Sequence, residues 1–549
     1  MGYEERTGEQ GIVGFGGLNL AVSEIEVPLG QSPDLGNVDL HPYGTVRPRS
    51  GISLLSTVAD EAKSIWRARS DSGSVYYYAQ AGGVIYRSTS LSGSWTSTGR
   101  TVSLSKRCCY ANARFEGASV VLVVDGENEP FMLTMSSAIA SDAQDWPAGE
   151  YGDGGEGTGT KGYPAAWVGD WPTSIAIINQ GRGASAHRLQ AWGFSERYRV
   201  DYSELGVTTN FLRSNVDDEA ATSQPEFDGG YYLVGDGDQD DIIAIESMYS
   251  YSVVFKRSRL FIMASDPGLD DFAVAAVYPV GAMSRRSVIR FGNDIAFWSA
   301  TGPRLLSSTD QYGDLKQANI GREVQDLIET ITGSSRDEVF CLNDLDNNRL
   351  IWYAPSGSVQ QNNLCLVYYY DQPRWTRYSG GRTAMVDGFV VGRESGGGQS
   401  IYTLGYDGSV YEAGSAADDA GTAISSYYYT AWINFGAISD AARTLWMDLL
   451  YGAGGDLGLT SEYEEDFTGI LTECEPPRKL IGGQGFRWDD PNAAWDDDRF
   501  KWDQAGKGIK ELGMPGISNM VRIKFSSDGS GGYELLGFRI EARQKGARA

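Results

Sequence analysis

The feature that most constrains this chain is a run of short, strand-like segments that recurs in clusters. Segments of four to seven residues, rich in β-branched and aromatic side chains, alternate with Gly, Asn, Asp or Ser turns. The clusters repeat about every 40 to 60 residues, at 64–98, 108–134, 174–202, 242–278, 287–307, 338–378 and, less completely, 384–412. Three or four antiparallel strands at this period are typical of β-propeller blades, because one such sheet cannot bury both faces alone.

The repeat predicts an all-β chain in three parts. Residues 1–45 form an extended N-terminal segment that joins a platform, and residues 46–420 form a β-propeller of six blades, with seven as the alternative count. A Gly-rich insertion at about 138–172 is predicted to be a loop that leaves the propeller. Residues 421–549 form a C-terminal β-sandwich-like platform domain. An ordinary multi-sheet β protein is the alternative to the propeller.

Two other patterns refine this division. Residues 321–332 are the clearest stretch with helical periodicity, and they predict about three turns of helix. Near residue 421 the pattern changes to longer alternating strands. Val521, Ile523 and Phe525 fall on one face, and so do Leu536, Phe538 and Ile540, as expected for strands with one buried face.

The charge balance excludes several classes of partner. The chain has 46 basic and 72 acidic residues, a net charge of −26. Binding to nucleic acid through a diffuse basic face, or to an anionic membrane surface, is therefore not expected. The chain has no run of 18 apolar residues and its first residues do not resemble a signal peptide, so we expect a soluble protein made in a cytoplasm without membrane insertion. Five scattered cysteines without CxxC spacing fit a reducing compartment.

No metal or cofactor site is predicted. The acidic stretch 235–241 resembles a calcium loop, but its sixth position is Asp241 where an EF-hand needs Gly, and its twelfth is Ser247 where Glu is needed. We interpret it as an acidic turn that enters a strand at Ile242–Met248. The Gly-rich stretch 14–19 precedes no helix that could bind phosphate.

The chain is predicted not to be an enzyme and to have no catalytic residues. It contains no GxSxG motif, and its two histidines, His41 and His187, are interpreted as structural or surface residues. A glycosidase is the main enzymatic alternative, because propellers host such enzymes and need only paired carboxylates. The nearest match to a sialidase Asp-box, Ser88 to Trp95, lacks the Asp and occurs once. Acidic side chains from different blades that meet an Arg cluster in a pocket would favour this alternative, and a plugged or shallow mouth would count against it.

Three tryptophans stand at a period of seven residues. Trp488, Trp495 and Trp502 are each followed by Asp. Pro491 and the surrounding Asp residues argue against a helix, so each Trp is expected to anchor a short turn or strand edge. Their rings either cover the sandwich core or serve as partner-interface residues, since Trp is favoured at binding hot spots.

The opening of the chain resembles that of many tailed-phage virion proteins. The motif Phe15-Gly16-Gly17-Leu18-Asn19 is followed by 28–39 (PLGQSPDLGNVD) and by 44–51 (GTVRPRSG). These match a pattern similar to that of the tail nozzle (hub) proteins of short-tailed phages, which contain propellers. Further stretches that resemble blades of this family are 252–261, 284–305, 349–353 and 375–378.

The resemblance implies a structural virion protein, made in the bacterial host cytoplasm and built into the phage tail. Proteins of this family form rings, six-fold in the family, in the nozzle or hub. Their N- and C-terminal portions dock on a tail adaptor protein and the propeller projects outward. Here residues 1–45 and 421–549 would then contact the adaptor. Tail fibres or a tailspike are further expected partners.

Genomic DNA is expected to pass through the channel of such a ring without tight binding, because the net negative charge repels phosphates. Two other functions stay open from sequence. One is a carbohydrate-binding or carbohydrate-cleaving propeller. The other is a general interaction scaffold, which would differ from the tail protein only in its partner.

Overall fold

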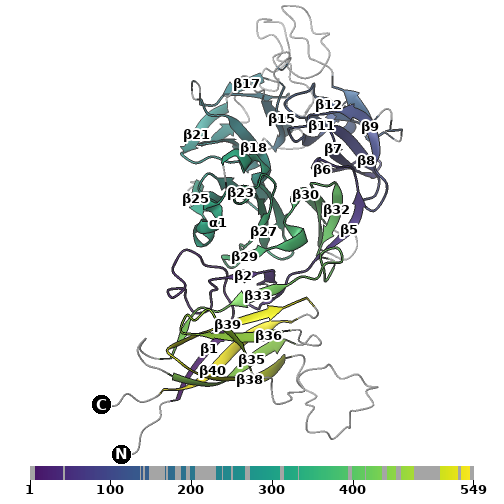
Figure 1. Cartoon of the computed structure of the whole chain (residues 1–549). Helices are drawn as coiled ribbons and strands as arrows, with labels where there is room; N and C mark the ends of the chain where they lie inside the picture. The colour runs from purple at the N-terminus through teal and green to yellow at the C-terminus, as the bar shows by residue number, and fades with distance from the viewer. Residues whose placement is uncertain are drawn as a thin grey trace, which may run out of the picture.

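The computed structural model describes most of the chain. The described residues are 7–40, 44–115, 117–136, 138–139, 142–146, 167, 171–179, 187–192, 198–203, 230–235, 237, 239–248, 251–265, 272–308, 315–331, 333–392, 398–414, 416–435, 442–452, 459–474, 507–529 and 533–544. In these residues strands predominate, and the chain forms a β-propeller with a β-sandwich beside it (Figure 1).

Seven four-stranded antiparallel sheets form the blades of the propeller. Blade 1 consists of β6 (Ala62–Arg69), β7 (Val75–Ala81), β8 (Val84–Ser88) and β9 (Thr96–Thr101). Blade 2 consists of β10 (Cys109–Phe115), β11 (Ala118–Val124), β12 (Phe131–Leu133) and β13 (Ala143–Asp145). Blade 3 consists of β14 (Ser174–Asn179), β15 (His187–Trp192), β16 (Arg199–Tyr202) and β17 (Gly230–Leu233). Blades 4 and 5 consist of β18 (Ile242–Met248), β19 (Tyr251–Lys256), β20 (Leu260–Ser265) and β21 (Phe272–Tyr278); and β22 (Ile289–Phe291), β23 (Asp294–Ser299), β24 (Gly302–Ser308) and β25 (Leu315–Asn319). Blades 6 and 7 consist of β26 (Phe340–Asp344), β27 (Arg349–Ala354), β28 (Leu364–Tyr369) and β29 (Arg374–Tyr378); and β30 (Met385–Gly392), β31 (Gln399–Gly405), β32 (Ser409–Ala413) and β5 (Ile52–Thr57).

The last blade is closed by a strand from near the start of the chain. Strand β5 pairs antiparallel with β32, so Ile52 lies opposite Ala413. The blade count is therefore seven, the larger of the two counts that the sequence left open. The sequence pattern in 384–412 predicts three strands, which correspond to β30, β31 and β32. The fourth strand of this blade, β5, lies more than three hundred residues earlier in the chain.

The predicted insertion at 138–172 begins too early. Strand β13 within it completes blade 2 by pairing with β12. Trp146 and Trp167 are buried, and their rings meet edge to face with centroids 5.9 Å apart in the core between blades 2 and 3. In the described part of this stretch, therefore, the chain belongs to the propeller and does not leave it. Most of the Gly-rich remainder lies outside the described residues.

The sandwich combines strands from both ends of the chain. One sheet has the order β1 (Thr7–Val13), β40 (Leu535–Gln544), β35 (Ala442–Gly452) and β38 (Lys507–Ser518). The other has the order β2 (Leu35–Gly36), β33 (Ser426–Tyr429), β39 (Met520–Ser527), β36 (Thr460–Glu465) and β37 (Leu471–Glu473), with β34 (Ile433–Asn434) also pairing with β39. Strands β1 and β40, nearest the two ends of the chain, lie side by side (Figure 1).

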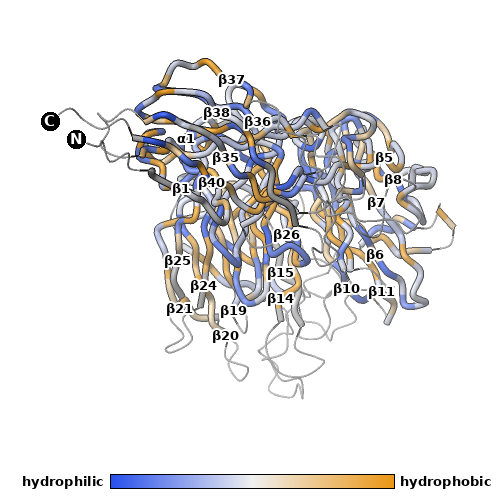
Figure 2. The backbone as a smooth tube through the Cα atoms, turned by 90° about the horizontal axis from the view of Figure 1, so that it is seen from below, coloured by the Kyte–Doolittle hydropathy of each residue, from blue (hydrophilic) through white to orange (hydrophobic). Residues whose placement is uncertain are grey.

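The alternation predicted for the sandwich strands is confirmed in β39, where Val521, Ile523 and Phe525 are fully buried. In β40 the prediction holds for Phe538 and Ile540, but Leu536 is half-exposed. A register shift in the pairing of β35 with β40 separates Leu536 from the buried set. Orange, hydrophobic stretches occur along strands of both parts of the molecule (Figure 2).

The predicted helix at 321–332 is shorter than expected. It consists of a 3-10 turn, η5 (Arg322–Val324), followed by α1 (Gln325–Glu329). Val324, Ile328 and Ile331 are buried as the periodicity predicts. Further 3-10 turns are η4 (Arg285–Ser287), η6 (Gly333–Glu338) and η7 (Gly380–Arg382). None of the helices in the described ranges is long and apolar enough to span a membrane.

The N-terminal segment links the sandwich to the propeller along the outer strand of blade 6. After β1 it runs past β29, where the Leu18 amide donates to the Trp375 carbonyl at 2.8 Å and the Asn37 amide to the Arg377 carbonyl at 2.8 Å. It then forms β3 (Val38–Asp39) and β4 (Arg47–Pro48) and enters blade 7 as β5. The segment covers an edge that would otherwise expose unpaired backbone groups.

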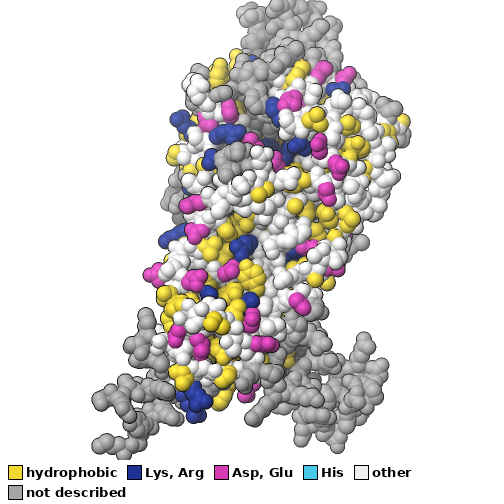
Figure 3. All heavy atoms as spheres, in the orientation of Figure 1, with side chains coloured by type: hydrophobic (Ala, Val, Ile, Leu, Met, Phe, Trp, Pro, Cys, Tyr) yellow, Lys and Arg dark blue, Asp and Glu magenta, His cyan; other side chains and the backbone are white. Residues whose placement is uncertain are grey.

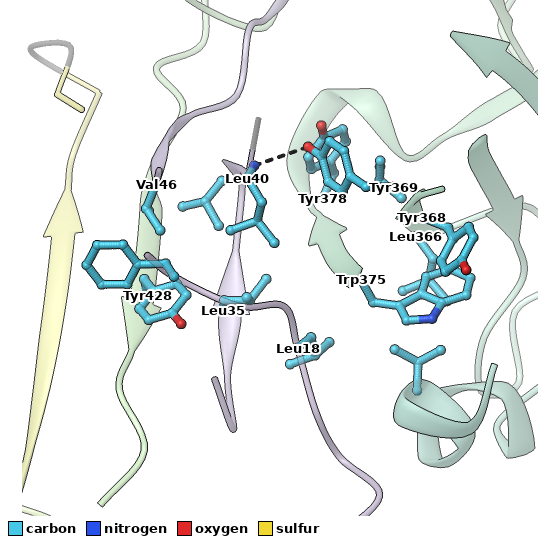
Figure 4. Close-up of a cluster of buried hydrophobic side chains, with 14 of the residues drawn as sticks. Leu18, Leu35, Leu40, Val46, Leu366, Tyr368, Tyr369, Trp375, Tyr378 and Tyr428 are labelled. Carbon is cyan, nitrogen blue, oxygen red and sulfur yellow. Dashed lines mark hydrogen bonds between the residues drawn. The ribbon is translucent and has the colours of Figure 1, made fainter. Parts of the chain in front are cut away.

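The FGGLN motif contributes to this contact. A Cβ on Gly17 would lie 2.6 Å from the Trp375 nitrogen, and one on Gly16 would lie 2.7 Å from the Gly30 carbonyl oxygen. A larger residue at position 17 would therefore push the segment away from blade 6, and one at position 16 would separate two parts of the segment itself. The flanking apolar side chains of the segment pack against blade 6 and the sandwich in one continuous core that includes Leu18, Leu35, Leu40, Val46, Trp375 and Tyr428 (Figure 4).

Candidate functional site

The blades are arranged around a central axis (Figure 1), and residues from their first strands line a cavity there. Several of them contact the first strand of the next blade, as β6 does with β30 and β10 with β14. The cavity has a volume of about 330 Å³, and every blade, or the turn before it, contributes to its lining. We call it the axial pocket. Its lining includes Trp66, Tyr110, Thr173, Ile242, Arg285, Glu338 and Asp387.

Charged residues of both signs line the axial pocket. The basic residues are Lys106, Arg107, Arg257, Arg285 and Arg286, and the acidic residues are Asp125, Asp241, Asp337, Glu338 and Asp387. Blue Lys and Arg side chains gather around the middle of the propeller face, with magenta acidic side chains among them (Figure 3). Acidic side chains from different blades thus meet an Arg cluster, which is the arrangement that favours the carbohydrate alternative.

Two ion pairs brace the pocket across the axis. Arg107, before blade 2, pairs with Glu338, before blade 6, and the Tyr406 hydroxyl donates to Glu338 at 2.9 Å. Burial lowers the pKa of Arg107, but Glu338 and Tyr406 outweigh burial, so this pKa lies above its ordinary value. Arg286 pairs with Asp387, whose other oxygen accepts from the Ile65 amide at 2.9 Å. These contacts join blades 1, 2, 5, 6 and 7.

Arg285 differs from the other arginines in the pocket. Its Nε donates to the Ser174 hydroxyl at 2.9 Å, and no carboxylate among the described residues comes within ion-pair distance of it. By contrast, Arg257 has Asp337 at 3.4 Å and Asp241 at 3.9 Å, and Lys106 has Glu127 at 3.7 Å. Arg285 is half-buried, so its remaining N–H groups reach the solvent in the pocket.

One wall of the pocket is aromatic. The rings of Trp66 and Tyr110 are stacked, with centroids 5.6 Å apart and planes at 13°. The Tyr110 hydroxyl is 2.9 Å from the Ser64 hydroxyl, and burial raises the pKa of Tyr110 well above its ordinary value. Burial likewise raises the pKa of the nearby Cys108 thiol well above its ordinary value, so this thiol is not a nucleophile at neutral pH.

Three of the five acidic residues of the pocket, Asp125, Glu338 and Asp387, are already engaged. Asp125 accepts from the backbone amides of Ser103 at 2.7 Å and Glu127 at 2.9 Å, as expected for a residue that holds a turn. Glu338 and Asp387 are held in the ion pairs described above. A glycosidase needs one carboxyl group that can give up a proton and a second that is free to act as base or nucleophile. The contacts of these three groups favour a bracing role over acid–base catalysis.

A second concentration of charge lies where the N-terminal segment, blades 6 and 7 and the sandwich meet. We call it the junction cluster, and it borders a cavity of about 740 Å³. Its members are Asp39, Arg49, Asp344, Arg349, Arg382 and Asp419, which all are nearly fully buried.

Arg349 is at the centre of the junction cluster. Its Nη1 lies 2.8 Å from Asp39 Oδ1 and its Nε 2.7 Å from Asp344 Oδ2. Burial raises the pKa of Asp39, but Arg349 and a hydrogen bond from Tyr378 outweigh burial, so this pKa lies below its ordinary value of 3.8. The Tyr369 hydroxyl also donates to Asp39, at 3.1 Å, and it accepts from the Leu40 amide at 3.2 Å (Figure 4).

The other two arginines of the junction cluster, Arg49 and Arg382, also contact neighbouring groups. Arg49 binds both oxygens of Asp419, at 2.8 and 2.6 Å. Arg382 has no carboxylate partner in the described residues; it lies over the Tyr378 ring, 5.1 Å from the centroid, and donates to the Ser50 carbonyl at 3.2 Å. Its burial lowers the pKa of Arg382, but Tyr353 and Tyr378 outweigh burial and raise it. The junction cluster therefore holds the propeller and the sandwich together.

Most of the site residues that the sequence singled out belong neither to the axial pocket nor to the junction cluster. Trp488, Trp495 and Trp502 lie outside the described residues, as does His41. His187 is the first residue of β15. In the acidic stretch 235–241, Asp240 accepts from the amides of Arg257 at 3.1 Å and Ser258 at 3.0 Å, so its role is to hold a turn next to β18. Among the described residues, no three His, Cys, Asp or Glu side chains gather as a metal ion would require.

The axial pocket was missed because its members are far apart in sequence. The one local signal is Ser284-Arg285-Arg286-Ser287. Ser284 and Ser287 cap the turn η4 reciprocally, which places two adjacent arginines at a fixed point before blade 5.

Comparisons with known proteins bear only on the fold. No protein-family model matches the chain, and no curated protein matches it. Similar solved structures include BBS1N in complex with ARL6DN, soaked with mercury, which is 9% identical over 67% of this chain and 96% of that chain, with a TM-score of 0.40. Sqt1 of Saccharomyces cerevisiae is 9% identical over 66% of this chain and 98% of that chain, with a TM-score of 0.38. Likenesses this distant carry no argument about function.

Proposed function

We propose that the chain is a structural protein of a tailed-phage virion that forms a ring in the tail nozzle or hub, docks on the tail adaptor and surrounds the path of the DNA. The observation that carries this proposal is the platform built from both ends of the chain. Strand β1 pairs with β40, and β2 pairs with β33. The nozzle proteins that the sequence resembles use their N- and C-terminal portions for docking on the adaptor.

The junction supports the same role. A tail component must hold its parts in a fixed arrangement while force and DNA pass along it. Here the N-terminal segment binds the outer strand of blade 6, and the buried pairs Asp39–Arg349 and Arg49–Asp419 join distant parts of the chain. These contacts fix the orientation of the propeller relative to the platform.

The charge distribution also fits a channel protein. A ring of chains with net charge −26 each would present a wall that repels phosphates. In the axial pocket the basic residues are interspersed with an equal number of acidic residues, so the pocket offers no continuous basic track to DNA.

A ring needs two different patches that meet head to tail. Two groups of exposed apolar side chains are candidates for these patches. Phe467, Ile470 and Ile517 lie on the sandwich, and Tyr231, Leu233, Val274 and Val277 lie on β17 and β21, the last strands of blades 3 and 4. Ile470 is the most exposed of these, at 69%. The platform patch, with Trp488, Trp495 and Trp502 as further candidates, is the first place to test.

The decisive experiment is a symmetry-averaged cryo-EM map of the particle that carries this chain. We expect a ring of copies around the tail axis, below the adaptor, with the sandwich toward the adaptor. The absence of the chain from the tail axis, or from the particle, would overturn the proposal.

Assembly of the purified chain gives a faster test. We expect native mass spectrometry to detect a ring, six-fold in the resembling family, which Ile470→Asp disrupts. Leu345→Asp is the matched control, because Leu345 is an exposed side chain in the β26–β27 hairpin of the propeller. Equal assembly of both variants would remove the platform patch as the ring interface.

The carbohydrate-cleaving alternative is less well supported. It predicts free, paired carboxylates in the axial pocket, and the described ones hold turns or ion pairs. Release of reducing ends from polysaccharides by the purified protein would revive it, and would then require at least one of these contacts to break when substrate binds.

A further inference from the structure

We propose that the axial pocket binds an acidic sugar, a pyranose ring that carries a carboxylate, with Arg285 as the carboxylate anchor and the Trp66–Tyr110 stack as the wall beside the ring. The proposal stands independently of the tail function, because it concerns a site within one chain.

The first step is the unpaired cation. Arg285 uses one of its five N–H donors, on Ser174, and has no carboxylate within ion-pair distance among the described residues. Its neighbour Arg286 is neutralised by Asp387, and Arg107 by Glu338. A ligand carboxylate can therefore bind Arg285 without displacing an existing ion pair.

The second step is rigidity. Arg285 begins the turn η4, whose ends are held by the reciprocal Ser284–Ser287 cap. The Ser284 hydroxyl also donates to the Val339 carbonyl, just before blade 6. With its Nε fixed on Ser174 of blade 3, the guanidinium is oriented before any ligand arrives. The remaining Nη groups present the planar fork that matches a carboxylate in a two-point contact.

The third step is the shape of the rest of the pocket. A volume of about 330 Å³ is at the lower end of small-molecule sites and suits a monosaccharide or a short oligosaccharide terminus. Trp66 and Tyr110 give it a flat aromatic wall, against which the C–H face of a sugar ring can pack. Asp241 and Asp337 are partly exposed, and their oxygens can accept hydrogen bonds from sugar hydroxyls.

The same features disfavour other anions. A phosphate dianion would gain from Arg285 but would lie among the negative charges of Glu338, Asp387 and Asp125, and it would leave the aromatic wall uncovered. A singly charged carboxylate on an apolar-faced ring uses both the cation and the wall.

The test is binding to the purified full-length chain, measured by calorimetry or ligand-observed NMR with three probes: D-galacturonate, D-galactose and inorganic phosphate. We expect galacturonate to bind with a dissociation constant of about 1 mM or below, and galactose and phosphate at least about tenfold more weakly. No galacturonate binding at about 10 mM would overturn the proposal. Equal binding of phosphate would reduce the pocket to a general anion site and would overturn the sugar assignment.

Variants assign the roles. Arg285→Met should weaken galacturonate binding by at least about tenfold and leave the weak binding of galactose unchanged. Arg290→Gln is the matched control, because Arg290 is an exposed arginine on β22 outside the pocket.

Trp66→Leu should weaken the binding of galacturonate and galactose alike. Ser174→Ala removes the bond that orients Arg285, together with the contact of the same hydroxyl with the Cys109 sulfur at 3.8 Å. It should weaken galacturonate binding severalfold, which provides a test if Arg285→Met fails to fold. Galacturonate binding that is the same in all four variants and the unmodified chain would refute the assignment.

Discussion

The axial pocket and the junction cluster are built from the same residue types and behave differently. Both bring Arg and Asp side chains together from parts of the chain that are far apart in sequence. In the junction cluster Asp39, Asp344 and Arg349 are nearly fully buried, and each charge has a partner. In the axial pocket Arg285 is half-buried, and among the described residues its side chain binds a serine hydroxyl and no carboxylate. The first arrangement holds two domains together, and the second leaves a cation ready for a ligand.

The difference teaches how burial decides what a charged residue can do. A charge removed from water must be paired and hydrogen-bonded, or the fold loses several kcal/mol. A charge that still reaches water has no such requirement, so a binding residue can stay unpaired without a large cost in stability. The two regions should therefore respond to substitution in opposite ways.

The largest effect is expected from Arg349→Met. This change leaves Asp39 and Asp344 buried without their cation, and it should lower the free energy of unfolding by about 3–5 kcal/mol. Chemical denaturation followed by fluorescence measures this change. The matched control is Arg377→Met, which removes a half-exposed pair with Asp34 in the same junction and should cost about 1 kcal/mol or less. Similar losses in the two variants would contradict the distinction between the two regions.

A smaller loss is expected from Asp419→Asn. Arg49 keeps neutral acceptors in the Asn37 side chain and the Ser379 carbonyl, at 2.9 and 2.8 Å, so it does not become an orphaned charge. We expect a loss of about 1.5–3 kcal/mol, the value of charge-assisted hydrogen bonds. A loss as large as that of Arg349→Met would show that the junction cluster acts as one cooperative network.

Acid should weaken the junction cluster when Asp39 becomes protonated. Because the folded-state pKa of Asp39 lies below its ordinary value of 3.8, ionised Asp39 contributes stability that is fully present above about pH 4. That contribution is lost as the pH falls through the folded-state pKa. Thermal unfolding between pH 5 and pH 2 should therefore depend less steeply on pH in Asp39→Asn than in the unmodified chain. Equal slopes would mean that Asp39 does not titrate with folding.

The smallest effect on stability is expected from Arg285→Met. The change removes one hydrogen bond, to Ser174, from a half-exposed side chain and leaves no buried charge behind. The free energy of unfolding should change by about 0.5 kcal/mol or less. A loss of several kcal/mol would show that Arg285 is a structural residue like Arg349, and would remove the contrast between the two regions.

Much of the fold could be predicted from the sequence, because each blade is a local unit. Strands joined by short turns produce a local pattern in which apolar strand residues are followed by turn residues. The strand predicted at Ile242–Met248, for example, is observed with the same bounds. The strands β5 and β13 were missed for different reasons. β5 joins its blade from far away in the chain, and β13 is hidden in a Gly-rich stretch whose overall composition suggested a loop.

The candidate site was much harder to predict. In the sequence Asp387 is a single acidic residue within a predicted strand. No neighbouring residue indicates that it binds Arg286 and the Ile65 amide. The same holds for Asp39 and Arg349 in the junction. These contacts depend on how seven blades close into a ring, which is a property of the whole chain. Arg285 and Arg286 had the only local signal, in the serines that flank them.

The closure of blade 7 by β5, together with the pairing of β1 with β40, has a consequence for biosynthesis. During synthesis β5 must wait for β32, which follows it by more than three hundred residues, and β1 must wait for β40, which follows it by more than five hundred. The pairing of β5 with β32 is nested within that of β1 with β40, so the propeller can close first, whereas the sandwich must wait for β40. At usual rates of translation this wait lasts about half a minute or more. Individual blades can form in the meantime, but their open edges depend on protection from other chains until release. Closure of each domain is a late step that depends on contacts distant in sequence, which predicts slow folding. The finished molecule is expected to open correspondingly slowly.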